Sequence, residues 1–91
     1  MRKYRKIKGL KLNKNCLTDI GFEKLIPYLG SSSNLNLSFN NLSEEALNLI
    51  LKNRDKFSPL RIVNISSNKI DEKKAKPIIE ALKKIGINVS L

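Results

Sequence analysis

One short pattern recurs three times along this chain of 91 residues, and it constrains the fold more than any other feature. The order apolar-x-apolar-x-x-Asn-x-apolar is shared by residues 7–17, 35–42 and 60–70. Its asparagine recurs at spacings of 25 and 28 residues, as Asn15, Asn40 and Asn68. A repeat of this length indicates stacked units, each of which buries its apolar face against its neighbours.

Each unit is predicted to consist of a strand followed by a helix. Apolar residues alternate with polar ones at Leu35/Leu37 and at Val63/Ile65, as in a strand that presents one face to the core. Three residues after each asparagine comes a good helix N-cap, and acidic residues follow it: the caps are Thr18, Ser43 and Asp71. The predicted N-cap therefore lies at the same distance from the asparagine in all three units.

Two proline residues depart from the regular helical pattern. Pro27 and Pro77 fall inside the predicted helices, where each removes a backbone donor and favours a break. The third helix is therefore expected either to run on from Asp71 or to begin anew at Pro77.

The three units resemble leucine-rich repeats of the long, helix-containing, ribonuclease-inhibitor-like type, most closely over residues 10–25. The resemblance implies an α/β solenoid of three strand-helix units plus a final strand, with a parallel sheet on the concave face and helices on the convex face. It assigns a structural role, bonding the turn that leaves each strand, to Asn15, Asn40 and Asn68. Ser32 stands where a leucine-rich repeat normally has an apolar residue before the strand, so the second strand is expected to begin late or loosely. The expected organisation is a basic leader at 1–6 and a repeat domain at 7–91, with units at 7–31, 32–59 and 60–85 and a terminal strand at 87–91.

Composition excludes several kinds of function. The chain has no histidine and a single cysteine, Cys16, so zinc sites built from these residues, histidine-based catalytic sites and internal disulfides are excluded. Its acidic residues lie mostly in predicted first helical turns, where helix capping and the helix dipole explain them. We therefore expect no enzymatic activity, no catalytic residue, no metal and no cofactor. No apolar run is long enough for a membrane span or a signal peptide, and we expect a cytoplasmic protein.

The outward positions of the strands and of the turns after them are the predicted binding surface. Successive units stack these positions into rows that are polar, mostly uncharged and able to form hydrogen bonds. One aromatic residue, Phe39, stands among them, and an aromatic anchor ringed by polar groups suits a protein partner. The predicted partner-binding residues are Lys11, Asn13, Lys14, Asn36, Ser38, Phe39, Asn64, Ser66, Ser67 and Ser90.

A basic N-terminal segment is the alternative binding site. Of the formal net charge of +10, residues 1–14 carry +7, because they contain no acid. Clustered Lys and Arg side chains bind phosphates of nucleic acid or an anionic membrane surface. Only Tyr4 interleaves them, so a solvated charged segment is favoured over a dedicated site. The alternative patch, within residues 2–14, consists of Arg2, Lys3, Arg5, Lys6 and Lys8.

Neither end of the predicted stack has a polar cap. The apolar pattern begins at Ile7 and ends at Leu91, whereas terminal units of a stack need polar outer faces. The chain is therefore expected to be part of a larger repeat protein or to form a homo-oligomer through its uncapped ends.

Overall fold

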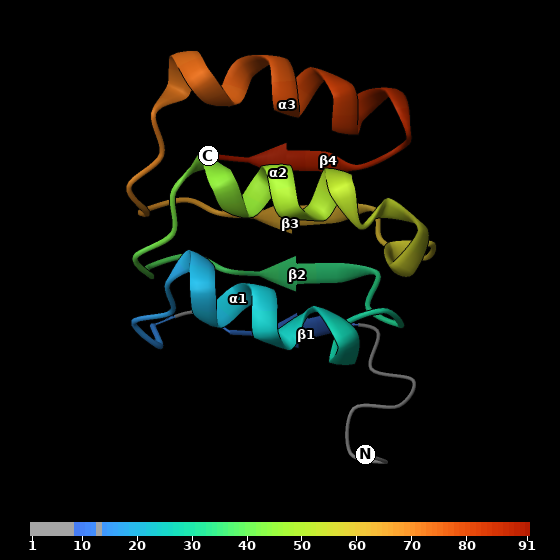
Figure 1. Cartoon of the computed structure of the whole chain (residues 1–91), viewed down its shortest axis with the longest axis horizontal. Helices are drawn as coiled ribbons and strands as arrows, with labels where there is room; N and C mark the ends of the chain where they lie inside the picture. Colours follow the sequence, from blue (N-terminus) through green and yellow to red (C-terminus); the bar gives the residue numbers. More distant parts are fainter. Residues whose placement is uncertain (1–8, 13) are drawn as a thin grey trace.

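The computed structural model describes the backbone of residues 9–12 and 14–91 and the side chains of residues 12 and 14–91. Strands β1 (Gly9–Lys11), β2 (Asn34–Asn36), β3 (Ile62–Asn64) and β4 (Asn88–Ser90) form one open parallel sheet in chain order. Helices α1 (Asp19–Leu25), α2 (Glu44–Lys52) and α3 (Glu72–Lys84) connect successive strands and cover one face of the sheet (Figure 1). The predicted small α/β domain with a parallel sheet is thus confirmed.

All three helices begin at the residues that the capping pattern predicts. The Thr18 hydroxyl accepts a hydrogen bond from the Gly21 N–H, and the Ser43 hydroxyl accepts one from the Glu45 N–H. The Asp71 carboxylate accepts from two N–H groups, those of Lys73 and Lys74. These bonds satisfy backbone donors that a helix leaves unpaired in its first turn.

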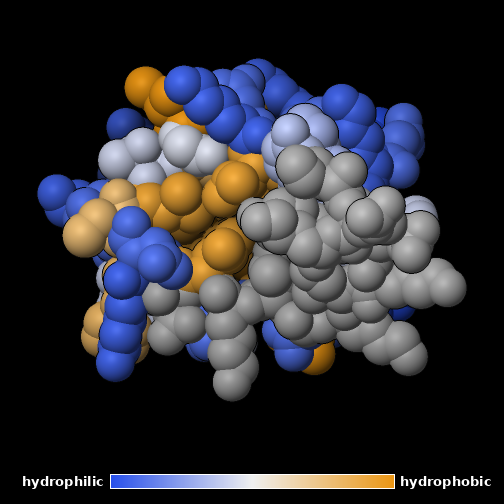
Figure 2. Space-filling model, turned by 90° about the horizontal axis from the view of Figure 1, so that it is seen from below, coloured by the Kyte–Doolittle hydropathy of each residue, from blue (hydrophilic) through white to orange (hydrophobic). Residues whose placement is uncertain are grey.

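The core lies between the sheet and the helices. Alternation along the strands turns Leu35 and Val63 inward, and both are fully buried. The two largest buried side chains, Phe22 and Phe57, come from α1 and from the 3-10 turn η3 (Arg54–Phe57). At the β1 end the molecule shows hydrophobic surface (Figure 2), and Ile20 of α1 is 70% exposed. The described core is therefore covered by the sheet on one side and by the helices on the other, while apolar side chains of described residues stay exposed at the β1 end.

The two prolines behave differently. α1 ends at Leu25, and Pro27 lies in the following 3-10 turn η2 (Ile26–Tyr28), as expected of a helix-breaking residue. Pro77, in contrast, lies inside α3, which runs unbroken for 13 residues, so the alternative of a new helix starting at Pro77 is wrong. Pro77 and Lys73, the residue four positions earlier whose carbonyl loses its usual helical donor, are both exposed, so the proline lies on the solvent side of the helix. None of the helices among the described residues has the length and apolarity that crossing a membrane requires.

The expectation of a late second strand is also wrong. β2 has the same length as β3, and Asn34 pairs with Ile62 and with Gly9 in register. Ser32 is buried in the position that Leu60 occupies before β3, and its N–H donates to the Leu29 carbonyl. The Ser33 carbonyl accepts from both Arg61 and Ile62, so parallel pairing begins before β2 itself. The backbone is thus bonded on both sides of this position, through the Ser32 N–H and through the Ser33 carbonyl.

Gly30, which follows η2, provides a test of how closely this segment packs against η3 of the next unit. A Cβ atom at Gly30 would lie 2.7 Å from the Lys56 carbonyl oxygen, a backbone atom that cannot rotate away. We expect Gly30→Ala to lower the free energy of unfolding in urea by about 2 kcal/mol. Gly21→Ala is the control, because its Cβ would meet the flexible side chain of Leu17 at 3.2 Å and alanine favours a helix by about 1 kcal/mol. Equal stability of the two variants would contradict this packing.

Candidate interaction surface

The turns that follow β1 and β2 are held together by the amide of Asn40. Its Nδ2 donates to the carbonyl oxygens of Leu12, Leu37 and Ser38, at 2.9, 3.0 and 3.3 Å. Its Oδ1 accepts from the N–H groups of Asn15 and Leu17, at 2.9 and 2.8 Å. One buried side chain therefore satisfies five backbone groups in two turns.

Asn68 repeats this arrangement one unit later. Its Nδ2 donates to the carbonyls of Leu37, Ile65 and Ser66, and its Oδ1 accepts from the Leu42 N–H at 2.9 Å. Asn15 itself is exposed, and its N–H is one of those bonded to Asn40. Asn40 and Asn68 each bond the turn after their own strand and the turn of the preceding unit.

The strand face opposite the helices carries a row of side-chain amides. The register places Lys11, Asn36, Asn64 and Ser90 side by side on the four strands. Asn36 Oδ1 accepts from the N–H and the hydroxyl of Ser38, and Asn64 Oδ1 accepts in the same way from Ser66. No described residue accepts from Nδ2 of Asn36 or Asn64, so both amides present N–H donors along this row. We call it the amide row.

The two serines of the predicted row formed by Asn13, Ser38 and Ser66 do not contribute equally. Ser38 is only 5% exposed, and its hydroxyl is used by Asn36, which removes it from the surface available to a partner. Ser66 is half-buried and bonded to Asn64 in the same way. The described part of the chain does not include Asn13, the side chain of Lys11 or the basic patch, which consists of Arg2, Lys3, Arg5, Lys6 and Lys8.

Another predicted row, formed by Lys14, Phe39 and Ser67, lies in the turns and has an unusual backbone. Lys14, Phe39 and Ser67 have φ of 62°, 59° and 57°, a left-handed conformation that is uncommon for residues other than glycine. Each precedes its asparagine by one position, so the same turn geometry recurs three times. Phe39 is 56% exposed, and the Lys14 ammonium lies 5.8 Å from the centre of its ring.

An exposed isoleucine was missed by the sequence-based prediction. Ile62 is 44% exposed on the outward side of β3, where the register places it between Asn34 and Asn88. The signal was present, because Ile62 directly precedes inward-facing Val63 and must therefore point the other way. Ile62 and Phe39 give the strand face two apolar residues beside the amide row.

Comparison with protein-family models, curated proteins and solved structures found no match for this chain. Its function is therefore inferred from its own residues and their geometry.

Asn40→Ala should lower the free energy of unfolding by about 3 kcal/mol, because buried donors and acceptors in two turns lose their partner. Asn41→Ala is a matched control: its side chain is exposed, and no more than about 0.5 kcal/mol should be lost. Urea unfolding followed by circular dichroism measures both values. A loss at Asn40 no larger than that at Asn41 would show that the amide contributes nothing to the turns.

Proposed function

We propose that this chain is a non-enzymatic leucine-rich-repeat module that binds a protein partner through the strand face opposite its helices. The parallel sheet with one helix after each of β1, β2 and β3 supports this assignment, as do the asparagine contacts in the turns. The partner meets the sheet on its concave side, and the helices on the convex side hold the sheet in place.

The amide row is the observation that carries this proposal. Asn36 and Asn64 are held in place by their own bonds to Ser38 and Ser66, so their N–H donors are fixed before a partner arrives. Donors fixed in advance lose less conformational entropy on binding than flexible ones do. Carbonyl or carboxylate oxygens of a partner's surface are their natural acceptors.

Apolar anchors beside the row supply binding energy that hydrogen bonds alone do not. Phe39 and Ile62 are about half-exposed in the free protein, and covering them removes apolar area from water. Interfaces take most of their energy from a few such residues surrounded by polar contacts. The surface proposed for the partner therefore consists of Lys14, Asn36, Phe39, Ile62, Asn64, Ser66, Ser67 and Ser90, with Lys11 and Asn13 from the sequence-based prediction.

A second candidate function follows from the charge distribution. Seven of the 18 basic residues lie within residues 1–14, which hold no acid, and such a segment binds nucleic acid or anionic membranes by releasing counterions. Affinity for unrelated DNA that falls steeply with added salt, and disappears on deletion of residues 1–6, would favour this function over the strand-face proposal.

Ile62→Arg tests the strand face directly. Ile85→Arg is its control, because Ile85 at the end of α3 is also 44% exposed and the added charge is the same. A partner identified by affinity capture with the wild-type chain should bind Ile62→Arg at least about tenfold more weakly in isothermal titration, a loss of about 1.4 kcal/mol. Binding to Ile85→Arg should be unchanged. Equal binding by the two variants would exclude the strand face as the binding site.

A further inference from the structure

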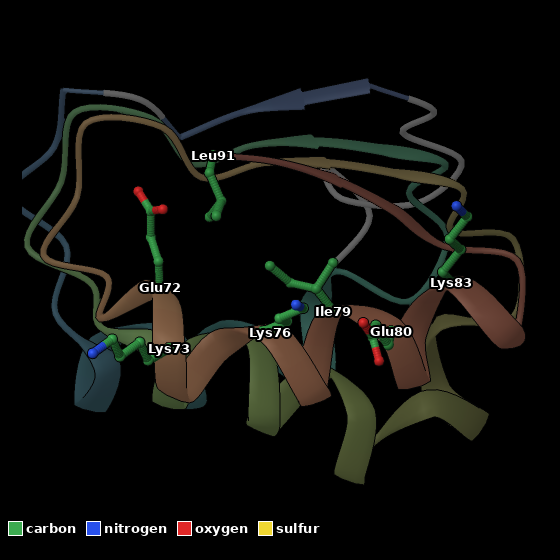
Figure 3. A pocket seen from close by; sticks show the side chains of 7 residues that line it. All are labelled: Glu72, Lys73, Lys76, Ile79, Glu80, Lys83 and Leu91. Carbon is green, nitrogen blue, oxygen red and sulfur yellow. The ribbon is translucent and has the colours of Figure 1, made fainter.

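The end of the molecule formed by α3 and β4 carries two adjoining pockets. The larger one, about 480 Å³, is lined by Ile79 of α3, by Leu91 and by charged side chains of α3 (Figure 3). The side chains of Ile79 and Leu91 extend into it from opposite sides. A smaller pocket of about 100 Å³ lies at the turn after β3, against Asn68 and Ile70, and shares Glu72 and Leu91 with the first.

Three kinds of contact join successive units inside the molecule, and the first is made by carboxylates. Asp19, the first residue of α1, accepts from the N–H and the hydroxyl of Ser43, the N-cap of the next helix. Glu44, the first residue of α2, accepts from the N–H of the next N-cap, Asp71. Glu72 is the first residue of α3, and its carboxylate accepts from no described residue. It is exposed beside both pockets.

The second and third kinds of contact between units are made in the turns, by the N–H and by the carbonyl of one residue in each turn. The N–H groups of Leu17 and Leu42 donate to the asparagine of the following unit, whereas their carbonyls accept from Asn41 and Lys69. Ile70 occupies the equivalent place in the third unit, and neither its N–H nor its carbonyl has a partner among the described residues. The smaller pocket lies against this residue.

Glu72 and Ile70, at this end of the molecule, therefore lack the bonds that their counterparts form between units inside the molecule. We infer that the α3–β4 end binds the β1–α1 end of a second copy of this chain. The second copy would place a strand beside β4, and its Thr18 would donate to Glu72 as Ser43 donates to Asp19. Its apolar side chains would fill the larger pocket against Ile79 and Leu91.

The β1–α1 end has the chemistry that this site requires. Thr18 lies three residues after Asn15, the same spacing that separates Ser43 from Asn40 and Asp71 from Asn68. Its hydroxyl accepts from the Gly21 N–H, as the Ser43 hydroxyl accepts from Glu45, and each hydroxyl retains its hydrogen for donation. Ile20 is 70% exposed, Leu12 and Leu17 are half-buried, and hydrophobic surface gathers at this end (Figure 2).

The charge of the chain sets the sign of the salt dependence. Each copy of the chain carries a formal net charge of +10, and the larger pocket beside α3 is lined by three lysines and two glutamates. Like charges therefore oppose the contact at low ionic strength, and screening reduces that repulsion. Association should strengthen as salt is raised from about 0.05 to about 0.5 M, whereas binding to nucleic acid weakens over the same range.

The test uses two variants that each block one end. Ile20→Asp places a charge on the β1–α1 end, and Glu72→Ala combined with Leu91→Asp removes the acceptor and the apolar contact at the other. Sedimentation equilibrium of the wild-type chain, up to about 500 µM, should show mass above that of one chain, and each variant alone should remain monomeric. An equimolar mixture should form dimers and nothing larger, because each variant keeps one working end.

Ile62→Arg is the matched control, because its charge lies on the strand face, and it should associate as the wild-type chain does. Circular dichroism checks that every variant is folded. A wild-type chain that stays monomeric at every concentration and salt would overturn the inference. So would association lost in Ile62→Arg and kept in the end variants, or folded end variants that form no dimer on mixing. The strand-face proposal would survive these outcomes, because it depends on different residues.

Discussion

The structure depends on the way in which buried asparagine amides satisfy the backbone of its turns. Where a strand ends and the chain turns toward its helix, carbonyl and N–H groups point inward without a strand partner, and leaving them unbonded costs free energy. An amide side chain offers two donors and an acceptor on a short stem, and Asn40 uses them on two turns at once. Because the amide reaches into the preceding unit, it also fixes how closely successive strands approach.

The local chemistry of the sequence was sufficient to predict the helix starts and the order of strands and helices, whereas the role of the turn asparagines was implied by the resemblance. Thr18, Ser43 and Asp71 act on donors within three residues of themselves, so their role is legible without knowledge of the fold. Leu35 and Val63 alternate with polar neighbours, which is enough to give the strands an inward face.

The features that could not be predicted depend on neighbours distant in the sequence. Burial of Ser32 is acceptable because pairing with β3 begins at Ser33, more than 25 residues from its partners. Pro77 is tolerated because that part of α3 faces solvent, which its sequence pattern alone does not show. Serine is a residue type common at protein surfaces, yet the bond of Ser38 to Asn36 and the packing around it leave Ser38 only 5% exposed.

Left-handed turn residues connect the stability of this fold with its proposed binding surface. A residue other than glycine in this conformation costs about 1–2 kcal/mol, and Lys14, Phe39 and Ser67 all adopt it. Backbone bonds offset part of the cost, since the N–H of Lys14 donates to the Ser38 carbonyl and the N–H of Phe39 donates to the Ser66 carbonyl. At Phe39 the conformation leaves a large ring half-exposed beside the amide row. Glycine would adopt the turn conformation with less strain, but it has no side chain for a partner to contact.

The two proposed surfaces face different directions, and each has a consequence for the other. Contact between the β1–α1 end of one copy and the α3–β4 end of the next is head-to-tail, so it leaves the strand face open and can continue to further copies. A strand added beside β4 would extend the amide row from Asn36 and Asn64 into the next chain. A partner long enough to span two copies would then meet both at once, and the second contact would form at high effective concentration. Self-association and partner binding would therefore strengthen each other without any residue shared between the two surfaces.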